Sequence, residues 1–328
     1  MAQKKNPPPH KASARRREKI LITGAGGYVG ATIAAFLKGE RKDEYEVVGF
    51  GHNAEIDKDI RDYAALSRAV KGAYAIVHAA SPTKDTWCKE HPYEALQTIV
   101  IGSRNVRRVA EERKVPLVIH FSTQAVYSNF AKRPLPLRED MALLPDTFYG
   151  ALKALAEGET RDLPAPRLRQ AGKRQDTRYR TRIVIVRPAN IYGIGAGVLR
   201  GNVVHAFAEN ARNGKSLTLN GGGKQRVDFV HVRDIARLIG LILGRPETSD
   251  RRQDVVNAGS GKPTAIKDIA RIVSSEMRRH GKKVKIIFKK VPKDTIAADR
   301  WLSIAKARKH FDWVLEISLK QGIMEFLE

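Results

Sequence analysis

A tyrosine and a lysine four residues apart are the first pair in this chain that could do acid–base chemistry. Tyr149 and Lys153 occupy positions i and i+4 of the segment YGALK, so both side chains share one face if the segment is helical. A phenol is a poor base because its ordinary pKa is near 10, and a nearby cation favours the phenolate. The pair predicts proton exchange with a substrate hydroxyl. Taken alone, this spacing occurs often by chance, and the alternative to a catalytic role is a pair of solvated side chains on a helix.

Two other polar segments follow predicted strands. The strand 117–121 runs into Ser122 and Thr123, and the strand 183–186 runs into the segment RPANIYG. A hydroxyl at such a strand end can hydrogen-bond the oxygen of a reacting carbon. Because ligands of open α/β sheets bind at the carboxyl ends of the strands, we expect these segments near the same site.

A glycine-rich turn follows the first predicted strand, 19–23, and precedes a predicted helix, 28–38. Its glycines are Gly24, Gly27 and Gly30, in the spacing GxxGxxG. The first glycine allows a tight turn, the second lets a pyrophosphate approach the backbone, and the third lets helix and strand pack closely. The helix N-terminus adds N–H donors for phosphate. The turn therefore predicts dinucleotide binding.

The end of the second strand leaves the choice between NAD and NADP open. An acid there would bond the ribose 2′-hydroxyl and repel a 2′-phosphate. Here the strand 47–50 runs into Gly51, His52 and Asn53, with neither an acid nor an arginine. Further on, Asp59 could accept a hydrogen bond from the adenine amino group, or it could cap a helix.

Short apolar strands alternate with helices from Lys19 to about Arg187, which predicts an α/β fold with a Rossmann-type, doubly wound parallel sheet. We expect a disordered basic arm over 1–18 and a dinucleotide-binding domain over 19–187, completed by about 225–245. Residues 188–328 are predicted to form mainly a smaller, substrate-binding part. Further strands are expected at 74–78 and 116–121. Further helices are expected at 62–71, 93–113, 149–160, 203–213, 232–245, 264–279 and 303–310.

The composition excludes several classes of protein. The chain of 328 residues contains one cysteine, Cys88, which excludes a disulfide framework and a multi-thiolate metal site, and we predict no metal. No apolar run approaches the roughly 20 residues that span a bilayer, and the N-terminus lacks the apolar core of a secretory signal. The formal charge of +25 is concentrated in 1–19, 161–182 and 278–290. We therefore expect a cytoplasmic protein whose basic tail and 161–182 loop either lack a partner or contact an anionic surface.

Taken together in this order, the motifs resemble the extended short-chain dehydrogenase/reductase family, in its NAD-dependent epimerase/dehydratase group of nucleotide-sugar enzymes. The resemblance covers about 19–328. The segments that carry it are TGAGGYVG, DIRD, IVHAAS, FSTQAVY, YGALK, RPANIYG, NGGGKQRVDFVHVRDIA, VNAGSGKPT and SIAKARKHFDW.

The resemblance implies a role for each matched residue. Tyr149 would be the catalytic acid/base, Lys153 would lower its pKa and bond the nicotinamide ribose, and Thr123 would bond the substrate hydroxyl or carbonyl. Asn190, with Arg226 as a second candidate, would hold the substrate. The residues implied to bind NAD or NADP are Gly24, Gly27, Tyr28, Val29, Gly30, Asp59, Ile60, Ala79, Ala80, Tyr149, Lys153 and Pro188.

The chain also departs from the family pattern. Dehydratases carry Asp-Glu directly after the Ser/Thr, where this chain has Gln124 and Ala125, so a 4,6-dehydratase is disfavoured. The phosphate-binding arginine usually precedes Asp-Phe, where this chain has Val227, with Arg226 one position earlier. Neighbours in a strand point to opposite faces, so Arg226 could replace that arginine only through a bulge.

Three functions follow as hypotheses. The first is an NAD(P)-dependent epimerase that removes and returns hydride on a nucleotide sugar. The second is an NADPH-dependent reductase or dehydrogenase of the same fold, acting on a keto sugar or another carbonyl substrate. The third is a non-enzymatic relative that binds nucleic acid, suggested by the charge of +25. A homodimer formed through paired helices is a further family expectation.

Overall fold

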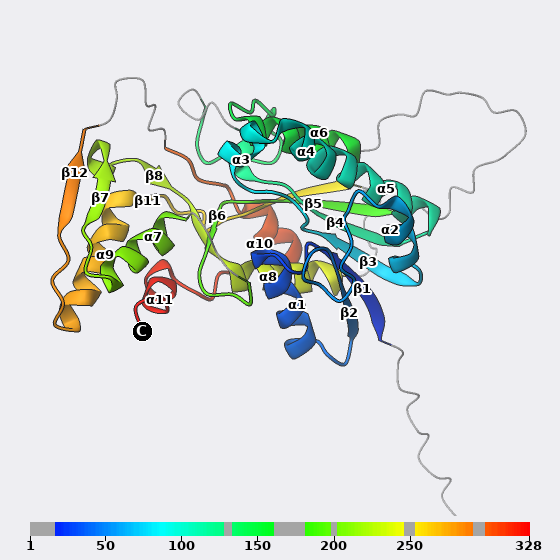
Figure 1. The fold of residues 1–328 in the computed structure, drawn as a ribbon, viewed down its shortest axis with the longest axis horizontal. Coiled ribbons are helices and arrows are strands. Elements are labelled where there is room, and N and C mark those ends of the chain that lie inside the picture. Colours follow the sequence, from blue (N-terminus) through cyan, green and yellow to red (C-terminus); the bar gives the residue numbers. More distant parts are fainter. Residues whose placement is uncertain (1–16, 128–132, 161–180, 198–201, 246–252, 291–298) are drawn as a thin grey trace, which may run out of the picture.

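Six parallel strands form the sheet at the centre of the computed structural model (Figure 1). The structure describes residues 17–127, 133–160, 181–197, 202–245, 253–290 and 299–328. The strand order is β10-β5-β4-β3-β1-β2. The strands are β1 (Glu18–Thr23), β2 (Tyr45–Phe50), β3 (Ala73–His78), β4 (Leu117–Phe121), β5 (Arg182–Pro188) and β10 (Gln253–Ala258). The predicted doubly wound α/β fold is confirmed.

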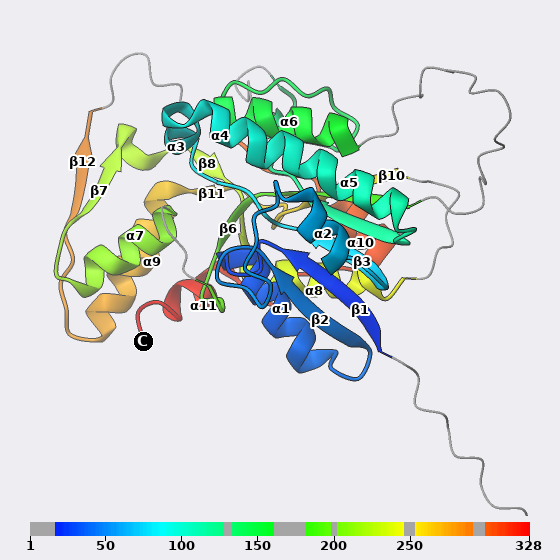
Figure 2. The same ribbon diagram turned by 45° about the vertical axis from the view of Figure 1, so that its right-hand side comes forward.

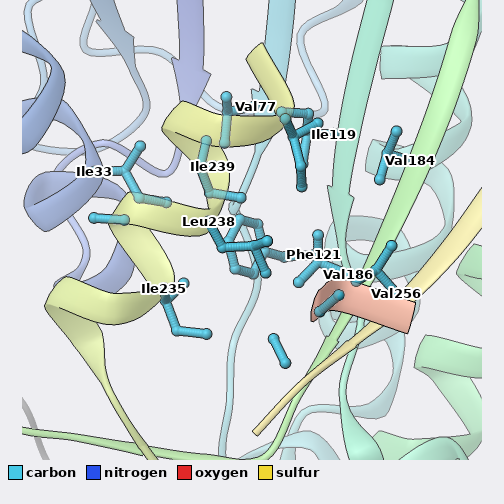
Figure 3. Packing of buried hydrophobic residues seen from close by; sticks show 14 of the residues in the cluster. Ile33, Val77, Ile119, Phe121, Val184, Val186, Ile235, Leu238, Ile239 and Val256 are labelled. Atoms are coloured by element: carbon cyan, nitrogen blue, oxygen red, sulfur yellow. The ribbon is translucent and has the colours of Figure 1, made fainter. Parts of the chain in front are cut away.

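Helices cover both faces of this sheet because its strands are apolar on both sides. One face packs against α1 (Tyr28–Glu40), α8 (Val232–Leu243) and α10 (Ala305–Phe311). Figure 3 shows Leu238 and Ile239 of α8 against Ile119 and Phe121 of β4. The opposite face packs against α2 (Tyr63–Ala69) and α5 (Gly102–Glu112). Burial on both faces explains the continuous apolar runs of these strands.

The C-terminal residues build a second, smaller core. It contains α7 (Val203–Arg212), α9 (Ile266–Arg279) and α11 (Leu319–Met324) around the parallel pair β7 (Leu217–Asn220) and β12 (Ile286–Lys289). Two short pairs lie between this core and the main sheet (Figure 2). They are β6 (Asn190–Tyr192) with β9 (Phe229–His231), and β8 (Arg226–Val227) with β11 (Thr264–Ala265).

The helix predicted over 93–113 is present as a continuous helical segment, but it contains a π-turn. The segment is divided into α4 (Pro92–Leu96), the π-turn η1 (Gln97–Ile101) and α5, and the short helix α3 (Asp85–Glu90), which was not predicted, precedes it. The Ser103 hydroxyl donates to the Ile99 carbonyl at 2.5 Å beside the π-turn. Apolar spacing does not distinguish an α-helix from one interrupted by a π-turn.

The sixth strand was not predicted either. β10 pairs with β5 in parallel register, so the dinucleotide-binding sheet takes a strand from beyond both the expected range of 19–187 and its expected completion at about 225–245. The division of the chain into two domains stays a prediction. The basic arm up to residue 16 and the predicted insertion over 161–180 lie outside the described residues. None of the described helices is long and apolar enough to cross a membrane.

Candidate active site

A cavity of about 940 Å³ lies where the carboxyl ends of the strands meet the C-terminal part. From the sheet side it is lined by the glycine turn, by the ends of β3, β4 and β5, and by α6 (Phe148–Thr160). The C-terminal side contributes residues of β6, α7, β7, β8 and β9. Of the predicted site residues, this cavity brings together Gly24, Gly27, Tyr28, Val29, Gly30, Ala79, Thr123, Tyr149, Lys153, Pro188 and Asn190.

The glycine turn has the geometry of a phosphate-binding cradle. Gly24 has φ +73°, and a Cβ there would lie 2.7 Å from the Ala80 backbone. A Cβ on Gly30 would lie 2.2 Å from the Gly24 carbonyl oxygen. Gly27 is the N-cap of α1, and no side chain caps the helix. The first turn of α1 therefore presents backbone N–H groups to the cavity, and these residues fit a dinucleotide pyrophosphate.

A second cavity of about 310 Å³ adjoins the same turn. Gly24, Gly27 and Ala79 line both cavities, and the smaller one adds Ala80, Asp59 and Ile60. The Asp59 carboxylate accepts two hydrogen bonds from the Arg61 guanidinium, and this interaction lowers the pKa of Asp59. Asp59 does not cap α2, because that role belongs to Asp62. The smaller cavity has the position expected for an adenosine.

Tyr149 is held at the start of α6 by a neighbouring element. Its backbone N–H donates to the Asp85 carboxylate of α3 at 2.8 Å. Burial raises the pKa of the Tyr149 phenol, and the Ser81 side chain acts in the opposite direction. The lowering of this pKa by Lys153 stays a prediction.

Lys153 is buried one helical turn after Tyr149. Its ammonium group donates to the Phe121 carbonyl at 2.9 Å and lies 6.0 Å from the centroid of the Tyr149 ring. Burial lowers the pKa of Lys153 to about 8, while the carboxylate of Glu157 acts in the opposite direction. The lysine is thus a buried cation fixed to the end of β4.

The hydroxyl of Thr123 lines the cavity beside these two residues. It accepts a hydrogen bond from the Ala125 backbone N–H at 3.2 Å, which leaves its own proton available to a ligand. Gln124 is buried in the short 3₁₀ turn that follows, Gln124–Tyr127. Because of this turn, Thr123 lines the cavity and the buried Gln124 does not.

A buried ion pair supports the site from behind. Glu157 and Arg187 are both fully buried, and two hydrogen bonds of 2.8 and 2.6 Å join them. The Ser122 hydroxyl donates to Glu157, and the Arg187 guanidinium also donates to the Tyr127 hydroxyl at 2.7 Å. The pair links α6 to β5 and to the end of β4.

Arg226 lies apart from the other predicted site residues. It is exposed, it forms a 2.7 Å ion pair with Asp299, and it does not line the cavity. Asn190 lines the cavity and is fixed by the Asp228 carbonyl, to which its side-chain amide donates at 2.9 Å.

The cavity contains few groups that could act as an acid or a base. Among the described residues that line it, none is acidic and none is a histidine. The Tyr28 hydroxyl donates to the Gly193 carbonyl at 2.7 Å, so its proton is already bonded to the backbone. Tyr149 is the phenol left for proton transfer, beside Lys153.

Comparison with known proteins identifies the family. Residues 20–259 match the family model described as the NAD dependent epimerase/dehydratase family. The chain belongs to this family. The expected resemblance is thereby confirmed for most of the chain, and the glycine turn, Tyr149 and Lys153 all lie within the matched region.

Several proteins named as epimerases or dehydratases are similar to this chain over most of its length. A UDP-glucuronate 4-epimerase of Thermodesulfobacterium geofontis is 26% identical, over 92% of this chain and 93% of that protein. The crystal structure of a UDP-glucose 4-epimerase of Thermotoga maritima with UDP-glucose has a TM-score of 0.77 and 20% identity, covering 94% of this chain and 97% of that one. An NAD-dependent NDP-hexosamine 5,6-dehydratase involved in tunicamycin biosynthesis has a TM-score of 0.74 and 24% identity, covering 95% and 97%. Both solved structures share the fold of this family member.

Two residues of the site in this family member were not predicted from the sequence. Asp85 fixes the N-terminus of α6, and Arg300 lines the cavity from the C-terminal part. Neither stands in a motif. The sequence offers one indication for Arg300, which is its position between Asp299 and Trp301, just before the helix predicted over 303–310.

Proposed function

We propose that this protein epimerises a nucleotide sugar by transient oxidation, with Tyr149 as acid/base and Lys153 as its cation. The observation that carries the proposal is the set of residues that line the larger cavity. The glycine turn and the Tyr149–Lys153 pair line one space, whose described lining contains no carboxylate and no imidazole. The relative of similar length is named a UDP-glucuronate 4-epimerase, which favours C4 of a UDP sugar as the reacting carbon.

Proton transfer at the sugar hydroxyl is the step assigned to this chain's own residues. Thr123 and Tyr149 would hold the hydroxyl, and Tyr149 would accept its proton and later return it. Lys153, held by the Phe121 carbonyl, would stabilise the phenolate. A bound nicotinamide supplies hydride acceptance and return. The keto sugar must turn over within the cavity so that its other face is reduced.

The cofactor would extend from the larger cavity into the smaller one. The backbone of Gly24, Gly27 and Gly30 and the first turn of α1 would hold its pyrophosphate, and Asp59 and Ile60 would contact its adenosine. We propose NAD, which the name of the 5,6-dehydratase neighbour specifies for that enzyme. NADP is the alternative, since the residues directly after β2, Gly51, His52 and Asn53, include no acid.

The surroundings of Thr123 disfavour elimination chemistry. A dehydratase needs a further acid or base beside the reacting sugar, to remove a proton and expel water. The two residues after Thr123 are the buried Gln124 and Ala125, and neither can perform that step. Epimerisation needs no group beyond Tyr149 and the bound cofactor.

The test starts from purified protein and a panel of nucleotide sugars. Mass spectrometry of released small molecules identifies the cofactor, and proton NMR follows the substrate. We expect one sugar to interconvert with its C4 epimer with no net change in absorbance at the nicotinamide wavelength. Stoichiometric consumption of NADPH would instead identify a reductase and overturn the proposal.

The variant Tyr149→Phe removes only the phenolic oxygen. We expect its turnover to fall by a factor of about 10² or more, the scale of general acid–base catalysis. Binding of NAD should stay within threefold of the parent, since the ring remains. Unchanged turnover would show that Tyr149 is not the acid/base.

A further inference from the structure

The strand β12 forms the outer margin of the C-terminal part. Figures 1 and 2 show it at the edge of the molecule, with β7 on its inner side. β7 and β12 make a two-stranded sheet, and no other described strand pairs with β12. One side of β12 is therefore an open edge, whose backbone groups no described strand uses.

The hydrogen bonds to β7 show which backbone groups face that open edge. The Leu217 N–H donates to the Lys285 carbonyl at 2.8 Å, so the backbone groups of Lys285 point toward β7. Successive residues of a strand direct their backbone groups to alternate sides of the strand. Ile286 and Phe288 therefore direct theirs away from β7, and each offers an N–H and a carbonyl to an added strand.

Two large apolar side chains of this strand are exposed. Ile287 is 43% exposed and Phe288 is 64% exposed. Neighbouring residues of a strand point to opposite faces, so each face of β12 carries apolar surface in contact with water. Val284 and Ile286 are the residues of this segment that pack against the C-terminal core. Exposed apolar residues beside an open edge are typical of a site that pairs with another strand.

Lysines surround these apolar residues. Residues 282–290, which we call the basic edge, contain five lysines, all exposed, and no acid. Two further exposed lysines flank β7, Lys215 and Lys224, and extend the positive surface to the neighbouring strand. Glu276, the nearest acid in sequence, pairs with Arg279 at 3.1 Å, and no described acid pairs with a lysine of the basic edge.

This charge decides which kind of chain can pair with the edge. A second copy would place lysine against lysine, and lysines on an edge strand are a common protection against such self-association. A peptide in which acids alternate with apolar residues would instead place its carboxylates beside the lysines. Its backbone would at the same time complete the sheet.

The open backbone distinguishes a peptide from other polyanions. A lipid surface would leave the backbone groups of Ile286 and Phe288 without partners in an apolar medium, where unpaired N–H and carbonyl groups are costly. Single-stranded nucleic acid stacks successive bases on several aromatic side chains, whereas the basic edge carries one, Phe288. An acidic strand satisfies the backbone, the lysines and the apolar side chains together.

We propose that the basic edge binds an acidic, extended segment of a partner protein as a third strand, paired through the backbone of Ile286 and Phe288. The site is separate from the one described above, since none of residues 282–290 lines either cavity. It gives a role to one of the three basic stretches of the sequence, which the proposed function leaves without one.

Synthetic peptides test the proposal on the full-length protein. The probe is a short, labelled peptide of alternating Glu and Val, and fluorescence anisotropy measures its binding. The same peptide methylated at every backbone nitrogen keeps the charges and lacks the N–H donors. We expect saturable binding of the probe and binding about 10-fold weaker or worse for the methylated peptide, which loses two or more hydrogen bonds. A peptide of alternating Lys and Val should not bind.

A pair of charge reversals measures the contribution of the lysines. Lys285→Glu/Lys289→Glu should weaken the probe about 10-fold, because two cross-strand attractions become repulsions. The control is Lys309→Glu/Lys320→Glu, which makes the same change in charge at exposed positions of α10 and α11 and should weaken the probe less than threefold.

Two variants at Phe288 separate its side chain from its backbone. Phe288→Ala removes the ring, and Phe288→Pro removes the ring and the outward N–H, a change that an edge strand tolerates. Phe288→Pro should bind the probe about fivefold more weakly than Phe288→Ala, the net contribution of one hydrogen bond. If Phe288→Pro melts well below the parent, the methylated peptide decides the same question on the parent protein.

Several results would overturn the proposal. Equal binding of the probe and its methylated form would exclude strand pairing, and equal binding by the parent and Lys285→Glu/Lys289→Glu would exclude the lysines. Binding of oligo(U) RNA or phosphatidylserine vesicles without binding of the probe would assign the edge to another polyanion. Dimerisation of the parent that Phe288→Pro abolishes would identify a second copy as the occupant. The assay uses no nucleotide sugar, so its outcome is independent of the proposed function.

Discussion

At the scale of single residues, burial of the Lys153 ammonium group serves the proposed chemistry but lowers the stability of the folded protein. Its ammonium group is buried, and one backbone carbonyl compensates for the lost water. The pKa near 8 means that the folded state binds this proton less tightly than the unfolded chain, where the pKa is about 10.4. Stability of the folded state should therefore increase as the pH rises from about 8 to 10.

The variant Lys153→Met should melt a few degrees higher than the parent at pH 7 while losing turnover. The shift of the lysine pKa corresponds to about 3 kcal/mol, part of which the lost bond to Phe121 offsets. The difference should shrink by pH 10, because the parent then buries a neutral amine. Calorimetry of cofactor-free protein at several pH values measures it. The exposed Lys320→Met is the control, and a difference that does not change with pH would contradict the prediction.

Residue types and spacing predicted one part of the site and missed the other. The glycine turn, Tyr149, Lys153 and Thr123 stand in contiguous motifs, and all of them line the larger cavity. Arg300 belongs to no motif, and its place follows from a single backbone bridge to Val227, 73 positions earlier in the chain. Arg226 was a candidate because it lies next to the position of the family's arginine, although the alternation of side chains along a strand already counted against it.

At the scale of elements, α6 is the helix on which the proposed chemistry depends, and two tethers hold it. Asp85 of α3 accepts from the Tyr149 N–H at its N-terminus, and Glu157 pairs with Arg187 of β5 further along. The bond to Asp85 fixes the backbone position of Tyr149, and the ion pair with Arg187 joins the helix to the sheet.

The variant Asp85→Ala should lower turnover about tenfold and destabilise the protein by about 1 kcal/mol, the usual cost of a lost helix cap. The Michaelis constant should change little, since Asp85 acts through the position of Tyr149. Asp85→Asn keeps an acceptor oxygen and should recover most of the rate. Lys89→Ala, which removes only the partly exposed ion pair with Asp85, is the matched control. A rate unchanged in Asp85→Ala would show that Thr147 alone positions the helix.

Breaking the Glu157–Arg187 pair should cost far more than removing both charges. Glu157→Gln leaves a buried guanidinium without its counter-charge, and we expect a loss of about 3–5 kcal/mol in urea unfolding. The double variant Glu157→Leu/Arg187→Met should be more stable than Glu157→Gln. A double variant as unstable as the sum of the single changes would contradict this account.

At the scale of the whole molecule, the charge of +25 acts against the fold and in favour of an anionic ligand. Like charges repel one another across the surface, and salt screens that repulsion within about 10 Å at 0.1 M. The same field attracts a sugar nucleotide, and salt weakens that attraction too.

Raising sodium chloride from about 20 to 200 mM should therefore increase the melting temperature and lower kcat/KM for the nucleotide sugar. Scanning calorimetry and initial rates measure the two effects in the same buffers. Sucrose at matched osmolality is the control for non-ionic effects. A melting temperature that falls with salt would indicate that specific ion pairs outweigh the general repulsion.

The strand order of the main sheet has a consequence for how the chain is made. β5 is complete at residue 188, yet its outer neighbour β10 is only synthesised with residues 253–258. Until then β5 is an open edge with unpaired backbone groups, which other chains can join. During translation β5 lacks this partner until about sixty-five further residues have been synthesised, and α8 packs against the sheet in that interval. A ribosome-bound fragment ending before β10 is thus the state of this protein with most need of protection by a chaperone.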